Sequence, residues 1–229
     1  QFLISDTRFR LRAAPEPGVD PPGVEIEGAR FTPRRAILET FSPDYGRSIY
    51  LLPLGERKKA LERLDWVKKA SVARFWPDRM QLRLEERKPV AFISGLNGQG
   101  IRLIDEEGYV MPVPARAPLN VPVLRGVTPG QPVNERKDRV RRAMRLTQQA
   151  APFLSEFSEI DIGEVENIKV TMKAGGNLVT LWLGNTRFGE RLRDFERALP
   201  EIQSRAPRAR VFDLRVDGKI LVIEELSGE

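Results

Sequence analysis

The residues of this chain that could perform chemistry are carboxylates, lysines and serines, because cysteine and histidine are both absent. This absence excludes thiolate nucleophiles, disulfides, Ser-His-Asp triads, histidine proton shuttles and nearly every zinc or haem site. Carboxylate pairs, Ser-Lys dyads and carboxylate-bound Mg²⁺ remain possible. The composition therefore argues against an enzyme without disproving one.

The carboxylates do not form a pattern that would support catalysis or hold a metal ion. The run Asp105–Glu107 lies in an expected hairpin turn, where adjacent side chains point in different directions and lack the spaced oxygen ligands of a calcium loop. The pair Glu85-Glu86 occupies opposite faces of a strand and cannot act as a general acid and base. Asp213 and Arg215 share a strand face, which indicates an ion pair. We predict no catalytic residue, no metal site and no cofactor.

Glycine clusters and tryptophans offer two further possibilities, and both have simpler explanations. Gly98-Gln99-Gly100 and Gly175-Gly176 lack the lysine and the strand-to-helix context of a phosphate-binding loop, so they indicate turns. Trp66, Trp76 and Trp182 could present indole faces to sugar rings. Each lies in or beside an expected strand among apolar neighbours, so packing in the core or in turns is favoured.

The net charge of +6 comes from 38 basic and 32 acidic residues, so the surface is heavily charged with a mild basic excess. Much of the excess lies in Glu135–Arg145, an expected helix. Its apolar stripe is predicted to consist of Val140, Ala143, Met144 and Ala151. A solvated helix face is favoured over a nucleic-acid surface, because no aromatic residues alternate with the basic ones.

The elements that position these residues indicate an α+β chain of two modules. From Val24 to Glu86 the expected order is strand, helix, helix, strand, strand, with the last strand marked by alternation of Met80, Leu82 and Leu84 with polar residues. Thr32-Pro33 has the composition of a capped helix start. Before this module, a strand-like Arg8–Leu11 precedes a Pro- and Gly-rich segment that is expected to be a loop or hinge.

A boundary is expected at Arg87-Lys88-Pro89, after which short strands and turns predominate. The second module is predicted to be a mostly antiparallel sheet with two flanking helices, the second from about Gly189 to Ser204. The expected domains are a membrane-proximal segment with a flexible insert at 1–23, a first domain at 24–88 and a second at 89–229.

The last expected strand, Lys219–Ile223, is apolar on both faces. A strand with one face in water should alternate between apolar and polar residues. Either the sheet is covered on both sides, or the strand presents apolar side chains and a free backbone edge to another chain that adds a strand. The residues alone leave these two interpretations even.

Several passages spread along the chain resemble the extracytoplasmic part of the FtsQ/DivIB family of bacterial cell-division proteins. They occur in the family's order and are Ile26-Glu27-Gly28, Leu64–Val67, Val72, Arg74, Trp76-Pro77, Leu82, Glu86–Ala91, Leu103–Asp105, Gly108, Val110, Pro122–Gly126, Leu183-Gly184 and Phe212–Arg215. The resemblance implies that the first module is a POTRA domain and the second is the family's β domain.

The resemblance also implies a function: a non-enzymatic scaffold of the divisome, active in septum formation, that binds FtsB/FtsL-like bitopic proteins and other divisome membrane proteins. In the family the partner pairs with the last strand, and the matching positions here are Val216, Asp217, Gly218, Lys219, Ile220, Leu221, Val222 and Ile223. Localisation has been linked to a strand of the POTRA domain, which matches Lys69, Val72 and Arg74. Nucleic acid is not an expected partner.

The resemblance further implies a single membrane-spanning helix upstream of Gln1, with this part of the chain on the periplasmic side of the inner membrane. Gln1–Ile4 could be the tail of such a helix, although no run in the sequence approaches the roughly twenty apolar residues that span a bilayer. The alternative is a POTRA-containing secretion or outer-membrane assembly factor. That class carries tandem POTRA modules or a transmembrane barrel, and this sequence indicates a single module.

Overall fold

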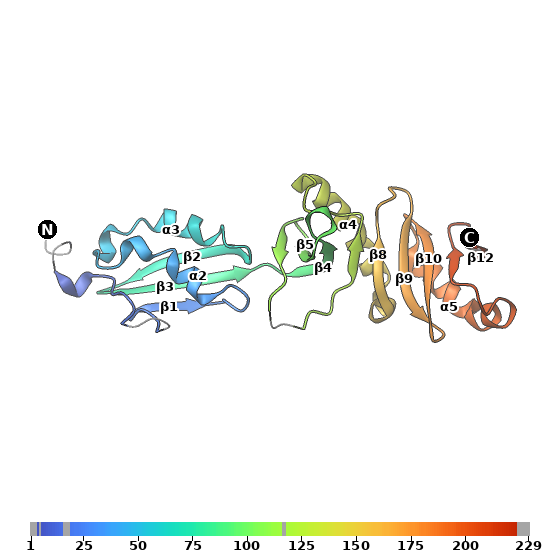
Figure 1. The fold of residues 1–229 in the computed structure, drawn as a ribbon, viewed down its shortest axis with the longest axis horizontal. Helices are drawn as coiled ribbons and strands as arrows, with labels where there is room; N and C mark the ends of the chain where they lie inside the picture. Colours follow the sequence, from blue (N-terminus) through green and yellow to red (C-terminus); the bar gives the residue numbers. More distant parts are fainter. Residues whose placement is uncertain (1–3, 5, 16–18, 116–117, 224–229) are drawn as a thin grey trace. The chain divides into compact units, whose positions relative to one another are not determined.

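The computed structural model describes residues 4, 6–15, 19–115 and 118–223, and they divide into two compact units, Gln1–Arg87 and Lys88–Glu229 (Figure 1). We call these the N-terminal and C-terminal units. Parts of the expected segment 1–23 and the end of the chain lie outside the described residues. No helix in the described ranges has the length and apolar character needed to cross a membrane.

The N-terminal unit has the predicted order of strand, two helices and two strands. Its elements are β1 (Val24–Glu27), α2 (Arg34–Glu39), α3 (Leu54–Leu61), β2 (Val67–Phe75) and β3 (Arg79–Glu86), with short 3-10 turns η1 (Thr7–Phe9), η2 (Ser42–Asp44) and η3 (Ile49–Leu51). The sheet order is β1-β3-β2, with β1 parallel and β2 antiparallel to β3. Met80, Leu82 and Leu84 are buried as their alternation predicts, because every second side chain of β3 faces the core.

Two local predictions for this unit were wrong. Arg8–Leu11 is not a strand: η1 ends at Phe9, and Arg10 makes a single bridge to Ser48. Thr32 does not cap α2, because its hydroxyl donates to Glu86 Oε1 at 2.6 Å. The backbone N–H groups of Phe31 and Thr32 donate to the same carboxylate, so Glu86 fixes the approach to the helix from the end of β3.

The C-terminal unit is built on a nine-stranded, mostly antiparallel sheet with two helices, as predicted. Its strands are β4 (Pro89–Ser94), β5 (Ile101–Asp105), β6 (Val110–Pro112), β7 (Val123–Arg125), β8 (Phe157–Asp161), β9 (Ile168–Ala174), β10 (Asn177–Gly184), β11 (Val211–Asp213) and β12 (Leu221–Ile223). Its helices are α4 (Val133–Gln149) and α5 (Phe188–Arg205), with 3-10 turns η4 (Leu96–Gly98) and η5 (Ala151–Glu156). The strand order is β12-β11-β10-β9-β8-β7-β4-β5-β6.

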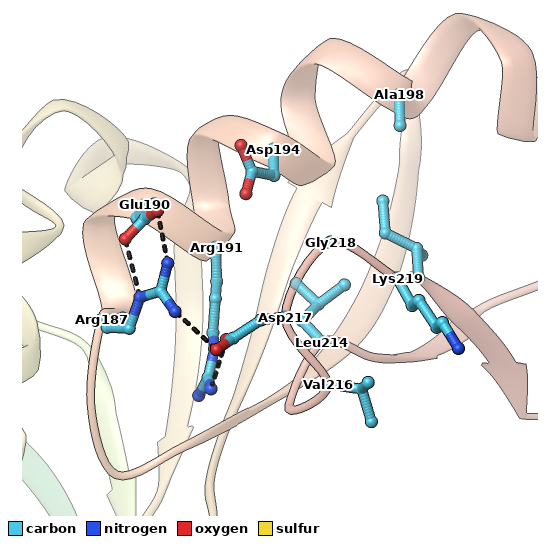
Figure 2. Close-up of a pocket in the computed structure, with 11 residues that line it drawn as sticks. Arg187, Glu190, Arg191, Asp194, Ala198, Leu214, Val216, Asp217, Gly218 and Lys219 are labelled. Atoms are coloured by element: carbon cyan, nitrogen blue, oxygen red, sulfur yellow. Dashed lines mark hydrogen bonds and ion pairs between the residues drawn. The ribbon is translucent and has the colours of Figure 1, made fainter.

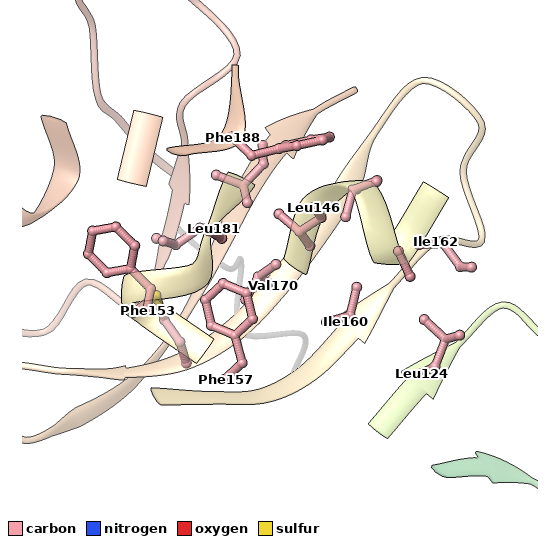
Figure 3. Packing of buried hydrophobic residues seen from close by; sticks show 14 of the residues in the cluster. Leu124, Leu146, Phe153, Phe157, Ile160, Ile162, Val170, Leu181 and Phe188 are labelled. Carbon is pink, nitrogen blue, oxygen red and sulfur yellow. The ribbon is translucent and has the colours of Figure 1, made fainter. Parts of the chain in front are cut away.

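Both helices pack apolar side chains against this sheet and so form one continuous core (Figure 3). Leu146 of α4 and Phe188 of α5 are fully buried and face residues such as Val170 and Leu181 of the sheet. The Phe195 ring of α5 lies 5.2 Å from that of Phe212 in β11. The position of α5 over β10 and β11 therefore depends on apolar packing.

The basic helix α4 differs from the predicted solvated face, because three of its arginines bind backbone carbonyls. Arg136 is buried and donates to the carbonyl oxygens of Gly108, Pro129 and Gln131 at 2.6 to 2.8 Å. Arg139 donates to Gly126 O at 2.7 Å, and Arg142 donates to Glu164 O at 2.8 Å. These side chains satisfy loop carbonyls at the ends of strands, a role that a charge pattern does not reveal.

The apolar stripe of α4 also differs in detail from the prediction. Val140 and Ala143 are buried as expected, whereas Met144 is half-buried and Ala151 lies beyond the helix and is exposed. Leu146 is fully buried in its place. The helix ends at Gln149, so the position of Ala151 is set by η5 and not by helical periodicity.

Candidate functional site

Among the described residues, the last strand, β12, forms one open edge of the large sheet, and it is shorter than predicted. β12 comprises only Leu221–Ile223, while Lys219 and Ile220 belong to the loop before it. β11 ends at Asp213, where the Asp213 carboxylate accepts the backbone N–H of Arg215 at 2.9 Å. This local hydrogen bond competes with the strand ladder and turns the chain away from the sheet.

The backbone polar groups of Phe212 are directed toward β10. The register pairs Thr180 with Val211 in parallel, and the Thr180 N–H donates to Arg210 O at 2.7 Å. At the other end of the ladder, the Leu214 N–H donates to the carbonyl of Trp182 at 3.0 Å. In a parallel ladder these bonds require both polar groups of the intervening residue, Phe212, to face the same neighbour.

The polar groups of Val211 and Asp213 must then face β12 on the other side. Their antiparallel partners are Ile223 and Leu221, so these two pairs are the hydrogen-bonded ones. Val222, between them, turns its N–H and C=O to the open edge. The register thus offers one backbone donor and one acceptor at residue 222 to an incoming strand.

Apolar side chains flank this backbone edge on both faces of the sheet. Leu221 is 47% exposed on one face and Val222 is 44% exposed on the other, since neighbouring residues of a strand alternate. Ile223 is partly exposed, and Ile220 packs against the core. Of the two interpretations left open by the sequence, cover on both sides is not provided by the part of the chain that the structure describes.

The loop before β12 is held to α5 by an ion-pair cluster (Figure 2). Arg187 binds both oxygens of Glu190 and also Asp217, and Arg191 binds Asp217 at 3.3 Å. A cavity of about 300 Å³ lies between this cluster and the loop, and Ala198 and the apolar residues of the loop line the rest of it. Asp217, predicted to bind a partner, is therefore itself bound by two guanidinium groups.

Arg191 has a wider structural role than its ion pair. Only 13% of its side chain is exposed, and it donates to the carbonyl oxygens of Leu183, Thr186 and Arg215, the last at 2.9 Å. These carbonyls belong to the end of β10, the segment just before α5 and the segment between β11 and β12. Arg191 therefore joins the three segments that set the position of the edge strand.

The ion pairs of this region stabilise the charged forms of Arg187 and Asp213. Hydrogen bonds to Glu190, together with the nearby Asp217 carboxylate, raise the pKa of the Arg187 guanidinium. The side chain of Arg215 donates to Asp213 and lowers the pKa of that carboxyl. The guanidinium carbon of Arg215 lies 4.9 Å from the centroid of the Trp182 ring, and the Lys169 ammonium lies 4.9 Å from the same centroid. This tryptophan therefore packs against two cations and not in the core.

The structure brings together the eight predicted partner-binding residues but not the three predicted recruitment residues. Lys69 is exposed and forms an ion pair with Glu85 at 3.9 Å, on one face of β2. Val72 is half-buried against the core, and Arg74 donates to Leu52 O at 2.6 Å on the other face. Alternation along the strand separates the three, so they do not form a single surface.

Sequence reasoning missed Arg187 and Arg191. Their spacing of four residues places them on one side of a helix, which is a visible signal. Their common partner Asp217 lies about thirty residues later, and Arg187 adopts a left-handed conformation with φ of 57° before α5 begins. Neither feature can be read from local sequence. Within the described ranges no group of three or more acidic side chains could hold a metal ion.

Comparisons with known proteins agree with this architecture. Residues 23–87 match the family described as POTRA domain, FtsQ-type, and residues 95–215 match the family described as cell division protein FtsQ/DivIB, C-terminal. The fold is therefore that of a bacterial cell-division protein with one POTRA domain and one β domain. The chain belongs to the FtsQ/DivIB family. The match to the C-terminal family ends before the loop 216–220 and β12.

Individual relatives extend the similarity over most of the chain. The cell division protein FtsQ of Koribacter versatilis is 30% identical over 221 residues, which cover 94% of this chain and 61% of that protein. FtsQ of Rhodothermus marinus is 31% identical over 211 residues, 88% of this chain and 77% of the relative. FtsQ of Rickettsia felis is 36% identical over 86 residues, or 38% of this chain and 32% of the relative.

Proposed function

We propose that this chain is the extracytoplasmic part of a non-enzymatic divisome scaffold that binds FtsB/FtsL-like bitopic proteins by strand addition at β12. Membership of the FtsQ/DivIB family supports the role in cell division. The observation that carries strand addition is the open edge at Val222, with exposed apolar side chains at Leu221 and Val222 on opposite faces. A partner strand would gain backbone hydrogen bonds at the edge and apolar contacts on both sides of it.

The proposal includes a membrane-spanning helix upstream of Gln1 that holds this part at the periplasmic face of the inner membrane, at the division septum. It divides the chain into a POTRA domain at 24–88 and a β domain at 89–229. Recruitment through the POTRA domain is proposed to involve Lys69, because its side chain is 71% exposed while Val72 and Arg74 face the core side of the sheet.

The decisive experiment is a proline substitution at Val222, because proline removes the outward N–H while leaving the hydrogen-bonded pairs of Leu221 and Ile223 in place. Binding of the periplasmic segment of the organism's FtsB-like protein would be measured by calorimetry. We expect a loss of about tenfold or more, since a backbone hydrogen bond is lost and the proline ring obstructs the incoming strand. Proline at Leu221 is less informative, because the Leu221 N–H faces β11 and the substitution would break the sheet itself.

A matched control exists on the opposite edge of the same sheet. The Asp105 N–H donates to Tyr109 O at 3.1 Å and Leu103 pairs with Met111, so alternation directs the N–H of Val110 to the open side of β6. Val110→Pro should leave partner binding unchanged. Equal affinity of Val222→Pro and the unmodified protein, with both variants folded by circular dichroism, would refute strand addition at β12.

A further inference from the structure

Three large aromatic rings gather on the surface of the N-terminal unit from segments far apart in the sequence. The Trp76 ring lies 5.6 Å from that of Phe9 and 6.4 Å from that of Tyr50, measured between centroids. Trp76 is 51% exposed and Tyr50 is 50% exposed, and Leu51 beside Tyr50 is 44% exposed. Exposed apolar side chains gathered at one place mark a surface for interaction with another molecule.

Three arginines belong to the same segments as these rings and expose much of their side chains to solvent. Arg8, Arg12 and Arg47 have side chains that are 69%, 62% and 49% exposed. Their carboxylate partners are much less accessible, at 17% for Asp6, 19% for Asp78 and 0% for Asp44. In each of these three ion pairs the more exposed charge is therefore positive.

These arginines are held next to the rings by the fold. Arg8 precedes Phe9 in η1, and Arg12 bonds Asp78 in the turn that follows Trp76. Arg47 precedes Ser48, which forms the bridge to Arg10. The carbonyl oxygen of Arg47 accepts the Leu11 N–H at 3.0 Å. We define the aromatic-arginine patch as Phe9, Tyr50, Trp76, Arg8, Arg12 and Arg47.

We propose that the aromatic-arginine patch docks on the anionic headgroups of a lipid bilayer, and this inference rests on the membrane anchor of the proposed function. Tryptophan and tyrosine favour the interface between hydrocarbon and water because they combine an apolar ring with a polar atom. Guanidinium groups form charge-assisted hydrogen bonds with phosphate. A surface that carries both exposed rings and exposed arginines fits both layers of the bilayer interface.

The position of the patch in the chain favours a membrane over a protein partner. Phe9 lies eight residues after Gln1, and the proposed function places the membrane anchor upstream of Gln1. The patch therefore belongs to the part of the described chain that follows the anchor first. Each basic side chain near an anionic surface adds to binding.

The test uses the 229-residue chain, without its anchor, and vesicles of phosphatidylethanolamine with phosphatidylglycerol, compared with vesicles of phosphatidylcholine alone. We expect cosedimentation with the anionic vesicles that weakens at high salt, since the charge contribution is screened. Trp76→Ser with Tyr50→Ser should reduce the partition coefficient about tenfold or more, because both rings lose their apolar contact with lipid.

Phe75 provides a matched control for the aromatic change. It is as exposed as Trp76, at 51%, but alternation places it on the face of β2 opposite Arg74. Phe75→Ser should bind vesicles as the unmodified protein does. An equal loss in both variants, or unchanged binding when Trp76 and Tyr50 are replaced, would overturn the proposal.

Other occupants of the patch would also overturn it and have their own readouts. A second copy of the chain would give a concentration-dependent dimer in analytical ultracentrifugation that Trp76→Ser abolishes. A protein partner would be captured by a photo-crosslinking residue at position 76 in the membrane-anchored gene product, without lipid adducts. The anchor itself is tested by alkaline extraction of that gene product, and binding at β12 by Val222→Pro, so failure of the patch is distinguishable from failure of the proposed function.

Discussion

Replacing Arg191 by methionine tests how the edge strand is held in position. Methionine keeps much of the side-chain volume but leaves the carbonyls of Leu183, Thr186 and Arg215 without this donor. At about 1 kcal/mol net for each hydrogen bond, the segments around the edge should lose about 3 kcal/mol of local stability. Local opening of β12 should then become about a hundredfold more frequent.

Residue-resolved amide hydrogen exchange by NMR measures this opening directly. The amides of Leu221 and Ile223, which pair with β11, should be protected and should exchange about a hundredfold faster in Arg191→Met. The amide of Val222 faces the open edge and should exchange rapidly in both proteins. The exchange rate of Val222 thus serves as an internal reference for the rates of Leu221 and Ile223.

Arg197 provides a matched variant on the same helix, because its side chain is 78% exposed and bonds only its neighbour Asp194 among the contacts described. Arg197→Met should leave the exchange of Leu221 and Ile223 unchanged. Equal rates in the two variants would show that Arg191 does not position the edge. Slow exchange at Val222 with rapid exchange at its neighbours would show that the derived register is wrong.

Two further predictions concern charges that are held within the C-terminal unit. Arg136→Met should lower the free energy of unfolding of the C-terminal unit by about 3 kcal/mol, because three carbonyls lose a buried donor. The exposed Arg141→Met should cost less than about 0.5 kcal/mol. Urea unfolding followed by Trp182 fluorescence measures both, and equal values for the two variants would contradict the prediction. The lowered pKa of Asp213 means that its stabilising bond to Arg215 is fully present above the ordinary value of 3.8 and is lost as the pH falls through the lowered pKa. The melting temperature should therefore exceed that of Asp213→Asn at neutral pH and approach it in acid, and a difference that persists unchanged to about pH 2 would refute the assignment.

Periodicity was sufficient to predict most of the fold. The alternation of Met80, Leu82 and Leu84 predicted both the strand and its buried face, since one strand face follows directly from residue type. The element order of the first unit and the mostly antiparallel second sheet were predicted for the same reason. The predicted helix cap was wrong because the Thr32 hydroxyl donates to Glu86, which is 54 residues away in the sequence.

The candidate site was predicted in position but not in detail. The apolar run in Lys219–Ile223 identified the last strand, which begins only at Leu221, and the end of β11 depends on the local bond between Asp213 and Arg215. The direction of each backbone N–H depends on the register with β11 and β10, which is a tertiary property. The binding of Asp217 by two arginines of α5 is likewise set by packing and not by spacing.

The two ends of the nine-stranded sheet differ in a way that gives its growth a direction. β6 ends in Pro112, and since Met111 pairs with Leu103, alternation places the missing N–H of Pro112 on the outer side of that strand. β12 carries no proline and presents a complete amide at Val222. A strand added at β12 would expose its own outer edge as the next template, whereas β6 offers an outward N–H at Val110 and none at Pro112.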